Sequence, residues 1–308
     1  MLLVNILWGL NAPISKEIMN MGVTPLALTT FRMVGAAISF WIASLFVKQE
    51  HVNHKDLLRL FFASLFCIVL NQGTFFFGLS LTSPVDATVV TTMLPIVTMI
   101  VAAFYLKEPV TGKKVLGIFI GAMGALILIF SNRGNIALGD GNVWGDLLCL
   151  SAQFSFAIYL TVFSDLITKY STITIMKWMF MYASICFVPI SYHDLVSVNF
   201  IEIPSFVYWE IAYVVFVATF IAYILILTGQ KSLRPTVVSM YNYVQPIVAS
   251  IVVVIIGMGT FGITKGLAVV LVFLGVYFVT QSRSREQLEA YEMQKQTKIN
   301  NKKYTHEK

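Results

Sequence analysis

The sequence predicts an all-α polytopic membrane protein. Of its 308 residues, 57% are hydrophobic and only 12% are charged, and the mean hydropathy is +0.80. A typical soluble domain is about 45–50% apolar and about 25% charged, so this chain lacks the polar side chains needed to cover a water-facing surface. The same composition excludes a disordered chain, and three cysteines are too few for a disulfide scaffold.

Apolar runs of the length of a membrane span follow one another along the whole chain. A spanning helix needs about 20 apolar residues, and helices are expected because spanning strands would alternate apolar and polar residues. Ten such runs and their short connections leave no room for a separate soluble domain. The predicted spans are residues 2–20, 25–47, 57–79, 84–106, 112–131, 142–165, 172–192, 205–229, 235–257 and 264–282.

The distribution of Lys and Arg between alternate loops predicts the orientation. Loops that face the cytoplasm carry the excess of these residues. One set of loops holds nine of them and the opposite set holds two, Arg133 and Lys265, so the first set and both termini are expected in the cytoplasm. The nine are Lys48, Lys55, Arg59, Lys107, Lys113, Lys114, Lys169, Lys231 and Arg234.

The two halves of the chain are similar at a fixed offset of 151 residues. Prolines and glycines that coincide at one offset are harder to obtain by chance than apolar matches. The matched positions include Gly78 with Gly229, Pro84 with Pro235, Pro95-Ile96-Val97 with Pro246-Ile247-Val248, Lys114 with Lys265, and Gly124 with Gly275.

This repeat predicts how the chain is divided. Residues 1–131 would form a five-helix repeat, residues 142–282 a second copy, and residues 283–308 a polar cytoplasmic tail. Because five is an odd number of spans, the second copy must lie inverted in the membrane. Inverted repeats are typical of secondary transporters, although a duplication without transport is an open alternative.

Several segments resemble the EamA-type ten-helix branch of the drug/metabolite transporter superfamily, and the similarity covers about residues 1–282. In the first half they are NILWGLNAPISK (5–16), Arg32 and LTSPVDATVVTTMLPIVTMIVAAFYLKEP (81–109). In the second half they are RPTVVSMYNYVQPIVASIVVVIIG (234–257) and LGVYFV (274–279). One departure is Gly259, at a position that is often acidic in the family and that corresponds to the end of the fourth span, where Glu108 lies.

The resemblance implies a carrier that exports amino acids or other small metabolites, sometimes driven by protons, with a cavity among spans 1–4 and 6–9. We therefore expect a secondary active transporter that works by alternating access in the bacterial cytoplasmic (inner) membrane, with a small-molecule substrate and no cofactor. A membrane channel and a membrane-embedded enzyme are the alternatives. No nucleotide-binding loop is present, and nucleic acid is not an expected partner.

Charged residues inside the predicted spans are candidates for gating or for the cavity, because each costs at least about 2.5 kcal/mol to insert. Arg32 and Asp86 could form an outer gate, although a permanent ion pair or side chains that reach the surface are equally open. Lys16 lies in the same outer part, and Lys177 lies near the cytoplasmic end of the seventh span. Asp86 and Glu210 are the candidate proton sites, and for Glu17 and Glu210 a position at the membrane surface is favoured.

Two prolines at matching places indicate where a binding site would lie. Pro95 and Pro246 sit near the middle of the fourth and ninth spans, where a proline kinks a helix and frees a carbonyl one turn earlier. In lipid such a carbonyl has no donor, so it must face protein, water or a ligand. The residues predicted to line a cavity there are Thr91, Thr92, Asn242, Tyr243 and Gln245.

Other polar and aromatic residues at middle depth would suit a small amphipathic or zwitterionic solute. Amide side chains also link helices to one another, so each residue alone has this second explanation. The candidates are Trp8, Asn11, Asn71, Gln72, Gln153, Tyr159 and Trp178.

The remaining motifs have structural explanations. Gly117, Gly121 and Gly124 allow close helix approach, which favours packing within the chain but leaves a homodimer possible. The His51-Val-Asn-His54 pair lacks further ligands, so a solvated loop is expected and no metal site. The chain enters an apolar run at Met1 without the basic start of a signal peptide, and this abrupt start also fits a chain that lacks a few upstream residues.

Overall fold

The computed structural model describes residues 1–82, 87, 90–132, 143–200, 202–255 and 262–282. Within these ranges all regular structure is helical. Asp86, Gly259 and the predicted cytoplasmic tail lie outside the described residues.

Most described helices coincide with the predicted spans, with ends that differ by a few residues. In the fourth predicted span, residues 84–106, the described helix α6 begins only at Leu94. Two of the long helices contain a π-helical segment, and two short helices, α9 and α11, were not predicted. In the first half the helices are α1 (Leu2–Asn20), α2 (Pro25–Ser44), α3 (His54–Ser64), η1 (Leu65–Leu70, π), α4 (Asn71–Leu81), α6 (Leu94–Tyr105) and α7 (Gly112–Asn132). In the second half they are α8 (Val143–Val162), α9 (Ser164–Lys169), α10 (Thr172–Ile190), α11 (Tyr192–Ser197), α12 (Ser205–Ala212), η2 (Tyr213–Ile221, π), α13 (Ala222–Gln230), α14 (Pro235–Met240), η3 (Tyr241–Tyr243, 3₁₀), α15 (Val244–Ile255) and α16 (Ile263–Thr280).

Five of the described helices are long and apolar enough to cross a membrane: Pro25–Ser44, His54–Leu81, Val143–Val162, Thr172–Ile190 and Ser205–Gln230. The helix Leu94–Tyr105 and residues 266–280 are shorter apolar segments. The chain is therefore an all-α, multi-pass membrane protein, and the number of ten crossings stays a prediction.

Local sequence explains where two of these helices begin. The Thr24 hydroxyl accepts a hydrogen bond from the Ala27 N–H at 3.2 Å, and Pro25 occupies the first turn of α2, where no N–H is needed. Ser171 caps α10 in the same way, with its hydroxyl 3.2 Å from the Thr174 nitrogen. These caps set the depth of the residues that follow them, including Arg32.

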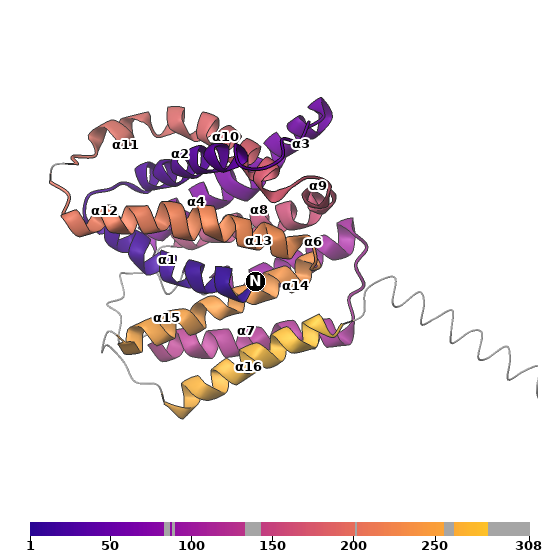
Figure 1. Cartoon of the computed structure of the whole chain (residues 1–308). Helices are drawn as coiled ribbons and strands as arrows, with labels where there is room; N and C mark the ends of the chain where they lie inside the picture. Colours follow the sequence, from indigo (N-terminus) through magenta and orange to yellow (C-terminus); the bar gives the residue numbers. More distant parts are fainter. Residues whose placement is uncertain (83–86, 88–89, 133–142, 201, 256–261, 283–308) are drawn as a thin grey trace, which may run out of the picture.

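The helices pack in pairs that cross between the two halves of the chain. Helices α7 and α16 lie side by side at one edge of the protein, and α2 and α10 lie together on the opposite side (Figure 1). Between them α4 packs on α8, and α1 packs on α15. First-half and second-half helices therefore alternate around the centre of the molecule.

The fourth and ninth predicted spans are interrupted rather than merely kinked. The chain leaves helical geometry at Thr92 and Met93, and α6 begins at Leu94 with Pro95 in its first turn. In the other half a 3₁₀ segment, Tyr241–Tyr243, separates α14 from α15, whose third residue is Pro246. A proline is tolerated in a first helical turn, where its missing N–H has no partner to lose. Each proline thus marks the restart of a broken span.

Candidate functional site

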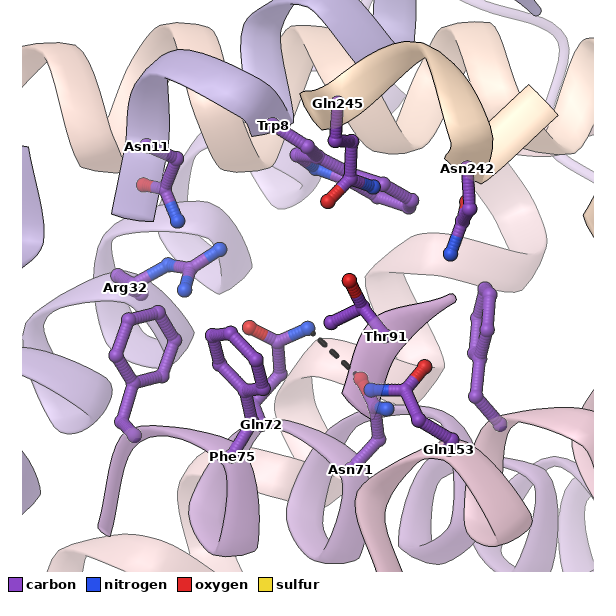
Figure 2. A pocket seen from close by; sticks show the side chains of 12 residues that line it. Trp8, Asn11, Arg32, Asn71, Gln72, Phe75, Thr91, Gln153, Asn242 and Gln245 are labelled. Carbon is purple, nitrogen blue, oxygen red and sulfur yellow. Dashed lines mark hydrogen bonds between the residues drawn. The ribbon is translucent and has the colours of Figure 1, made fainter. Parts of the chain in front are cut away.

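A pocket lined by polar and aromatic side chains lies at these two interruptions. Figure 2 shows side chains from both halves of the chain pointing toward this shared space. The pocket is lined by Trp8, Asn11, Arg32, Asn71, Gln72, Phe75, Phe76, Thr91, Gln153, Phe156, Asn242 and Gln245.

The broken spans deliver two of these residues directly. Thr91 lies at the last helical position before the turn that precedes α6, and Asn242 is the middle residue of the 3₁₀ segment before α15. Both prolines that follow are buried. The pocket therefore lies beside Thr91 and Asn242, the residues before the two prolines at which a cavity was predicted.

Amide side chains make much of the pocket polar, and some are held by the helices behind them. The Asn71 amide donates to the Ala152 carbonyl at 2.8 Å. The Gln72 amide donates to Asn71 Oδ1 and to the Tyr223 hydroxyl, both at 3.0 Å. Gln245 donates to Asn5 Oδ1 at 3.2 Å. These bonds fix the direction of each amide.

The Asn242 amide differs from these because it makes no hydrogen bond within the described part of the chain. It is 7% exposed and faces the pocket (Figure 2). A buried amide without a partner loses the hydrogen bonds that water would give it. Asn242 is therefore available to a solute.

Aromatic rings cover the apolar part of the pocket wall. The Trp8 indole N–H donates to the Ala218 carbonyl at 3.1 Å, so the ring is fixed against η2. Its edge meets Phe156, with ring centroids 6.3 Å apart. Phe75 lies on α4 and lines the same space. Neutral amides and fixed aromatic rings together suit a small solute with both polar and apolar parts.

Arg32 is the charged residue of the pocket lining. It is 3% exposed, its Nε–H donates to the Thr219 hydroxyl at 2.9 Å, and its guanidinium carbon lies 4.6 Å from the centre of the Phe76 ring. Its Nη1 atom is buried without a hydrogen-bond partner. The predicted Arg32–Asp86 pair involves a residue outside the described ranges.

Five predicted cavity residues lie away from this pocket. Tyr243 is turned toward α7, where its hydroxyl donates to the Ile118 carbonyl at 3.3 Å. Thr92 is buried just beyond Thr91 without reaching the pocket lining. Both sit next to a lining residue in sequence, but the turn at Thr92 and the 3₁₀ segment that contains Tyr243 direct them to another face.

The other three lie nearer the Lys- and Arg-rich loops than the pocket does. The Tyr159 hydroxyl donates to Gln230 Oε1 at 3.2 Å. Lys177 donates to Gln49 Oε1 at 3.1 Å and lies over the Trp41 ring. Trp178 meets the Trp41 ring edge-on at 5.7 Å. These residues occupy the correct helices at a different depth from the pocket.

The gating candidates among the described residues lie outside the pocket lining. Lys16 Nζ donates to the Leu79 carbonyl at 2.8 Å and lies 3.4 Å from the Ser80 and Thr82 carbonyl oxygens, so it binds the C-terminal end of α4. Glu210 lies beside Glu17 of α1, away from the pocket lining. Proton coupling through Glu210 stays a prediction.

Sequence reasoning missed the phenylalanines of the wall. Phe75 and Phe76 lie one helical turn after Asn71 and Gln72, and Phe156 lies three residues after Gln153. Residues three and four apart share a helix face. The three- and four-residue spacing from the polar candidates therefore could have identified these phenylalanines as lining residues.

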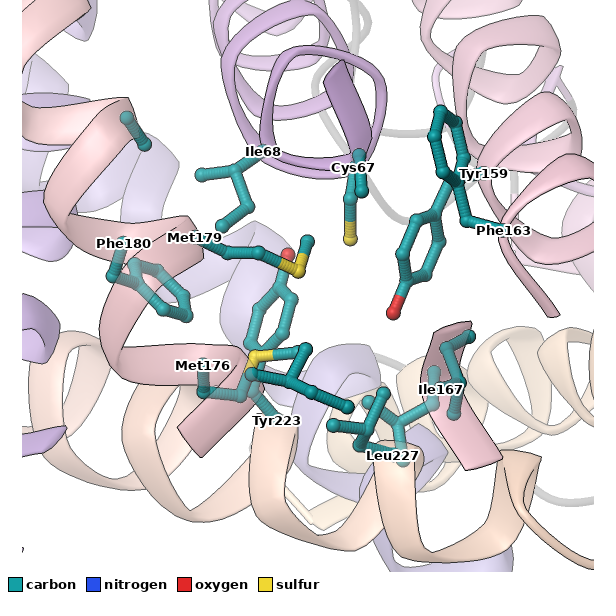
Figure 3. Packing of buried hydrophobic residues seen from close by; sticks show 14 of the residues in the cluster. Cys67, Ile68, Tyr159, Phe163, Ile167, Met176, Met179, Phe180, Tyr223 and Leu227 are labelled. Atoms are coloured by element: carbon teal, nitrogen blue, oxygen red, sulfur yellow. The ribbon is translucent and has the colours of Figure 1, made fainter. Parts of the chain in front are cut away.

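A cluster of buried apolar and tyrosine side chains packs next to the pocket, and Figure 3 shows its members. Its members Cys67 and Tyr159 lie closer along the chain to the Lys- and Arg-rich loops than the pocket residues Asn71 and Gln153 do. We call it the tyrosine cluster; its central members are Cys67, Tyr159, Met176, Met179, Tyr223 and Leu227.

Beyond the tyrosine cluster, polar side chains tie α3 to the segment between α8 and α10. Asp56 Oδ2 accepts a hydrogen bond from Lys169 Nζ and another from the Tyr170 hydroxyl, the latter at 2.6 Å. Arg59 Nη2 donates to both Asp165 carboxylate oxygens at 2.8 Å. We call these residues the Asp56 network.

Two further contacts reinforce the Asp56 network. Lys231 Nζ donates to the Tyr170 carbonyl at 2.8 Å, and the Ser171 N–H donates to Glu50 Oε2 at 2.9 Å. The hydrogen bond with Asp56 raises the pKa of Lys169, which keeps it charged. Burial raises the pKa of Glu50, but hydrogen bonds from Ser171 and Thr174 outweigh it, so the net shift is downward.

These features define a multi-pass membrane protein with a pocket of polar and aromatic side chains inside a helical bundle. The chain belongs to the EamA-like transporter family, whose profile matches residues 1–130 and again residues 143–281. The family and its named relatives identify the chain as a membrane transporter.

Two of the relatives are named as transporters. An uncharacterized transporter YyaM of Bacillus subtilis (strain 168) is 25% identical over 205 residues, 67% of each chain. An uncharacterized transporter of Archaeoglobus fulgidus is 28% identical over 173 residues, 54% of this chain and 57% of that protein. A WAT1-related protein of Arabidopsis thaliana is 23% identical over 193 residues, 55% of this chain and 56% of its own.

Among solved proteins, one crystal structure superposes on 90% of this chain and 93% of its own length with a TM-score of 0.69. Its sequence is 17% identical, so the likeness shows the shared fold. The matched segments span between about half and two thirds of the sequence relatives, and their printed names state no substrate.

Proposed function

We propose that this protein is a secondary active transporter that exports a small organic solute, such as an amino acid or another metabolite, by alternating access. The supporting observation is the position of the pocket. Helices of both halves wall it at the interruptions of the fourth and ninth spans, and the tyrosine cluster and Asp56 network close one end. A pocket closed toward one side is what one end state of such a cycle requires. Export as the direction rests on the family resemblance.

An inverted repeat would explain how the closed end changes sides, and one contact supports it. Gln72 Nε2 and the Tyr223 hydroxyl are 3.0 Å apart, and these residues are separated by 151 positions, the offset at which the halves align. A twofold axis that relates the two repeats exchanges residues at matching positions. Two such residues can be in contact only if both lie close to the axis. The Gln72–Tyr223 contact therefore supports a pseudo-twofold axis through the pocket wall.

The π-helical segments follow the same relation. Shifting Leu65–Leu70 by 151 residues places it on 216–221, inside the segment Tyr213–Ile221. The aligned glycines behave alike, because a Cβ on Gly78 would meet α8 at Gly145 O (2.7 Å), and one on Gly229 would meet Met1 at the start of α1. Each repeat would thus pack its third span on the first span of the other.

The topology that we propose has ten spans, with both termini and the Asp56 network on the cytoplasmic side of a bacterial inner membrane. The support for this orientation is the excess of Lys and Arg in the loops at that end. In this orientation the structure corresponds to a carrier whose pocket is closed toward the cytoplasm. Any homodimer would have to use a surface other than the α7–α16 contact.

Asn242→Ala is expected to reduce transport by between about twofold and tenfold, because it removes one hydrogen-bonding group that faces the solute. The measurement is saturable counterflow of labelled amino acids into proteoliposomes preloaded with the unlabelled compound. Asn20→Ala removes an exposed amide at the end of α1 and serves as the matched control. Equal transport by both variants, at equal folded yield, would contradict the assignment of Asn242.

The same experiment separates the carrier from the two alternatives. A channel would conduct without saturation or counterflow, and an enzyme would convert the solute into a new chemical species. Among the described residues no group of three or more His, Cys, Asp or Glu side chains is placed to hold a metal ion. Unsaturable flux or a converted product would contradict the proposal.

A further inference from the structure

Arg32 carries a positive charge into the pocket with a fixed orientation. The Thr219 hydroxyl donates to the Val214 carbonyl at 2.7 Å, so its oxygen lone pair is left to accept the Arg32 Nε–H at 2.9 Å. Val214 and Thr219 are five residues apart in the π-helical segment η2. The π-helical geometry thus orients the Thr219 hydroxyl, and this hydroxyl binds the Nε edge of the Arg32 guanidinium.

One face of the Arg32 guanidinium is covered by an aromatic ring, whereas its far edge has no hydrogen-bond partner within the described residues. Phe76 covers one face, with its ring centre 4.6 Å from the Arg32 guanidinium carbon. The Nη1 and Nη2 groups have no hydrogen-bond partner within the described residues, and Nη1 is fully buried. Figure 2 shows this edge directed into the space between Asn11 and Gln72.

Leaving this edge unpaired is costly inside a membrane protein. A buried charge without a partner costs several kcal/mol unless another group supplies its hydrogen bonds. The described lining of the pocket contains neither Asp nor Glu, and its other polar members are amides and the Thr91 hydroxyl. A neutral lining around a fixed cation favours an anion.

The geometry points to a carboxylate as the group that pairs with Arg32: we propose that the transported solute is a small organic acid whose carboxylate binds Nη1 and Nη2 together. A planar carboxylate matches two parallel N–H groups of a guanidinium, and such bidentate pairs are shorter and stronger than neutral hydrogen bonds. The remainder of the solute would face Trp8, Asn242 and the other amides. Transport of the acid rests on the proposed function, whereas binding of its carboxylate at Arg32 does not.

The test is the thermal stability of the purified protein in lipid nanodiscs with matched sets of compounds. Each set shares one skeleton and varies only the charged groups: an amino acid, the acid without its amine, the amino acid amide, and the amine alone. Suitable sets are leucine, 4-methylpentanoate, leucinamide and isopentylamine, and the corresponding phenylalanine and alanine sets. A ligand that binds the folded state raises Tm by mass action, visibly at about 10 mM for millimolar affinities.

We expect members with a carboxylate to raise Tm and the amides and amines to have no effect. Arg32→Gln is expected to weaken carboxylate binding by at least about tenfold, the loss of one or more charge-assisted hydrogen bonds. Arg32→Lys keeps the charge but lacks the two parallel N–H groups, so this variant should bind carboxylates with intermediate affinity. Lys177→Gln removes another buried cation outside the pocket and should bind as the wild type does.

Thr219 provides a second route if Arg32→Gln fails to fold. Thr219→Val removes the acceptor that positions Arg32 and should weaken carboxylate binding severalfold, whereas Thr219→Ser keeps the hydroxyl and should restore it. A merely structural role would lower the stability of the ligand-free protein without this rescue of binding.

Three results would overturn the inference: amides or amines that stabilise as well as acids, Arg32→Gln protein that keeps the carboxylate effect, or no stabilisation by any carboxylate. Equal destabilisation by Arg32→Gln, Asp86→Asn and the double variant, without any effect of carboxylates, would instead show a fixed pair between these residues and also overturn it. Carboxylate binding without counterflow would refute the transport function alone, and counterflow of neutral solutes would refute the carboxylate alone.

Discussion

Replacing Asp56 with Asn is expected to open the end of the protein that carries the Lys- and Arg-rich loops and to make Cys67 reactive. The Asp56 carboxylate holds Lys169 and the Tyr170 hydroxyl, and an amide cannot accept both bonds with the strength of a carboxylate. The tyrosine cluster beneath it holds Cys67, which is 1% exposed. Weakening the network shifts the equilibrium toward states in which this thiol meets water.

The measurement is the labelling rate of Cys67 by a membrane-impermeant maleimide added from the side of the Asp56 network, in protein with Cys186→Ser. We expect an increase of about tenfold, the effect of losing one hydrogen bond to a charged group. Cys149 reports on unfolding, because it is buried between α4 and α8, outside the tyrosine cluster. Labelling of both thiols would mean general unfolding.

Asp194→Asn, the same change on α11, serves as the control and should leave Cys67 unreactive. Unchanged labelling in the Asp56→Asn protein would mean that the tyrosine cluster alone closes this end. A rate that rises equally in both variants would show that the effect is not specific to the network.

The helices could be predicted from the sequence because the long apolar runs are bounded by capping, charged, glycine or proline residues. Thr24-Pro25 starts α2, and Ser171 starts α10, near the boundaries that the apolar runs indicated. The short helix Ser164–Lys169 could not be predicted in this way. A helix of fewer than two turns is too short to show a periodic pattern of apolar residues. It is stabilised by tertiary contacts, including the ion pair between Arg59 and Asp165.

The depth of the pocket was more predictable than its lining. The prolines located it along the fourth and ninth spans, and Thr91 and Asn242 do face it. Their neighbours Thr92 and Tyr243 do not, because each interruption changes the rotation between one residue and the next. A 3₁₀ or turn geometry cannot be read from residue types alone, so facing could not be assigned there.

The orientation of Arg32 was also outside the reach of sequence reasoning. It depends on Thr219, which is 187 residues away and whose hydroxyl is directed by a π-helical turn. Nothing in the composition of Tyr213–Ile221 distinguishes it from an ordinary apolar helix. The predicted Arg32–Asp86 pair rests on shared depth in the membrane, and it stays a prediction because Asp86 lies outside the described residues.

Gly275→Ala is expected to lower Tm by several degrees, because α7 and α16 approach each other through glycines. A Cβ on Gly275 would lie 2.6 Å from the Gly117 carbonyl oxygen and 2.7 Å from the Gly121 Cα, both backbone atoms that cannot rotate away. The helices would have to separate, and overpacking of this kind costs about 1–3 kcal/mol. Between helices in lipid, close packing is itself a main source of attraction.

Gly266→Ala, on the same helix, is the matched control, since nothing lies within 4 Å of its added Cβ. It should leave Tm unchanged or raise it slightly, because alanine loses less entropy than glycine on folding. The comparison also decides between the two explanations of the glycine spacing in the fifth span. Glycines that pack within one chain lower Tm when replaced and leave the oligomeric mass unchanged, whereas glycines at a dimer contact would change the mass of the particle instead.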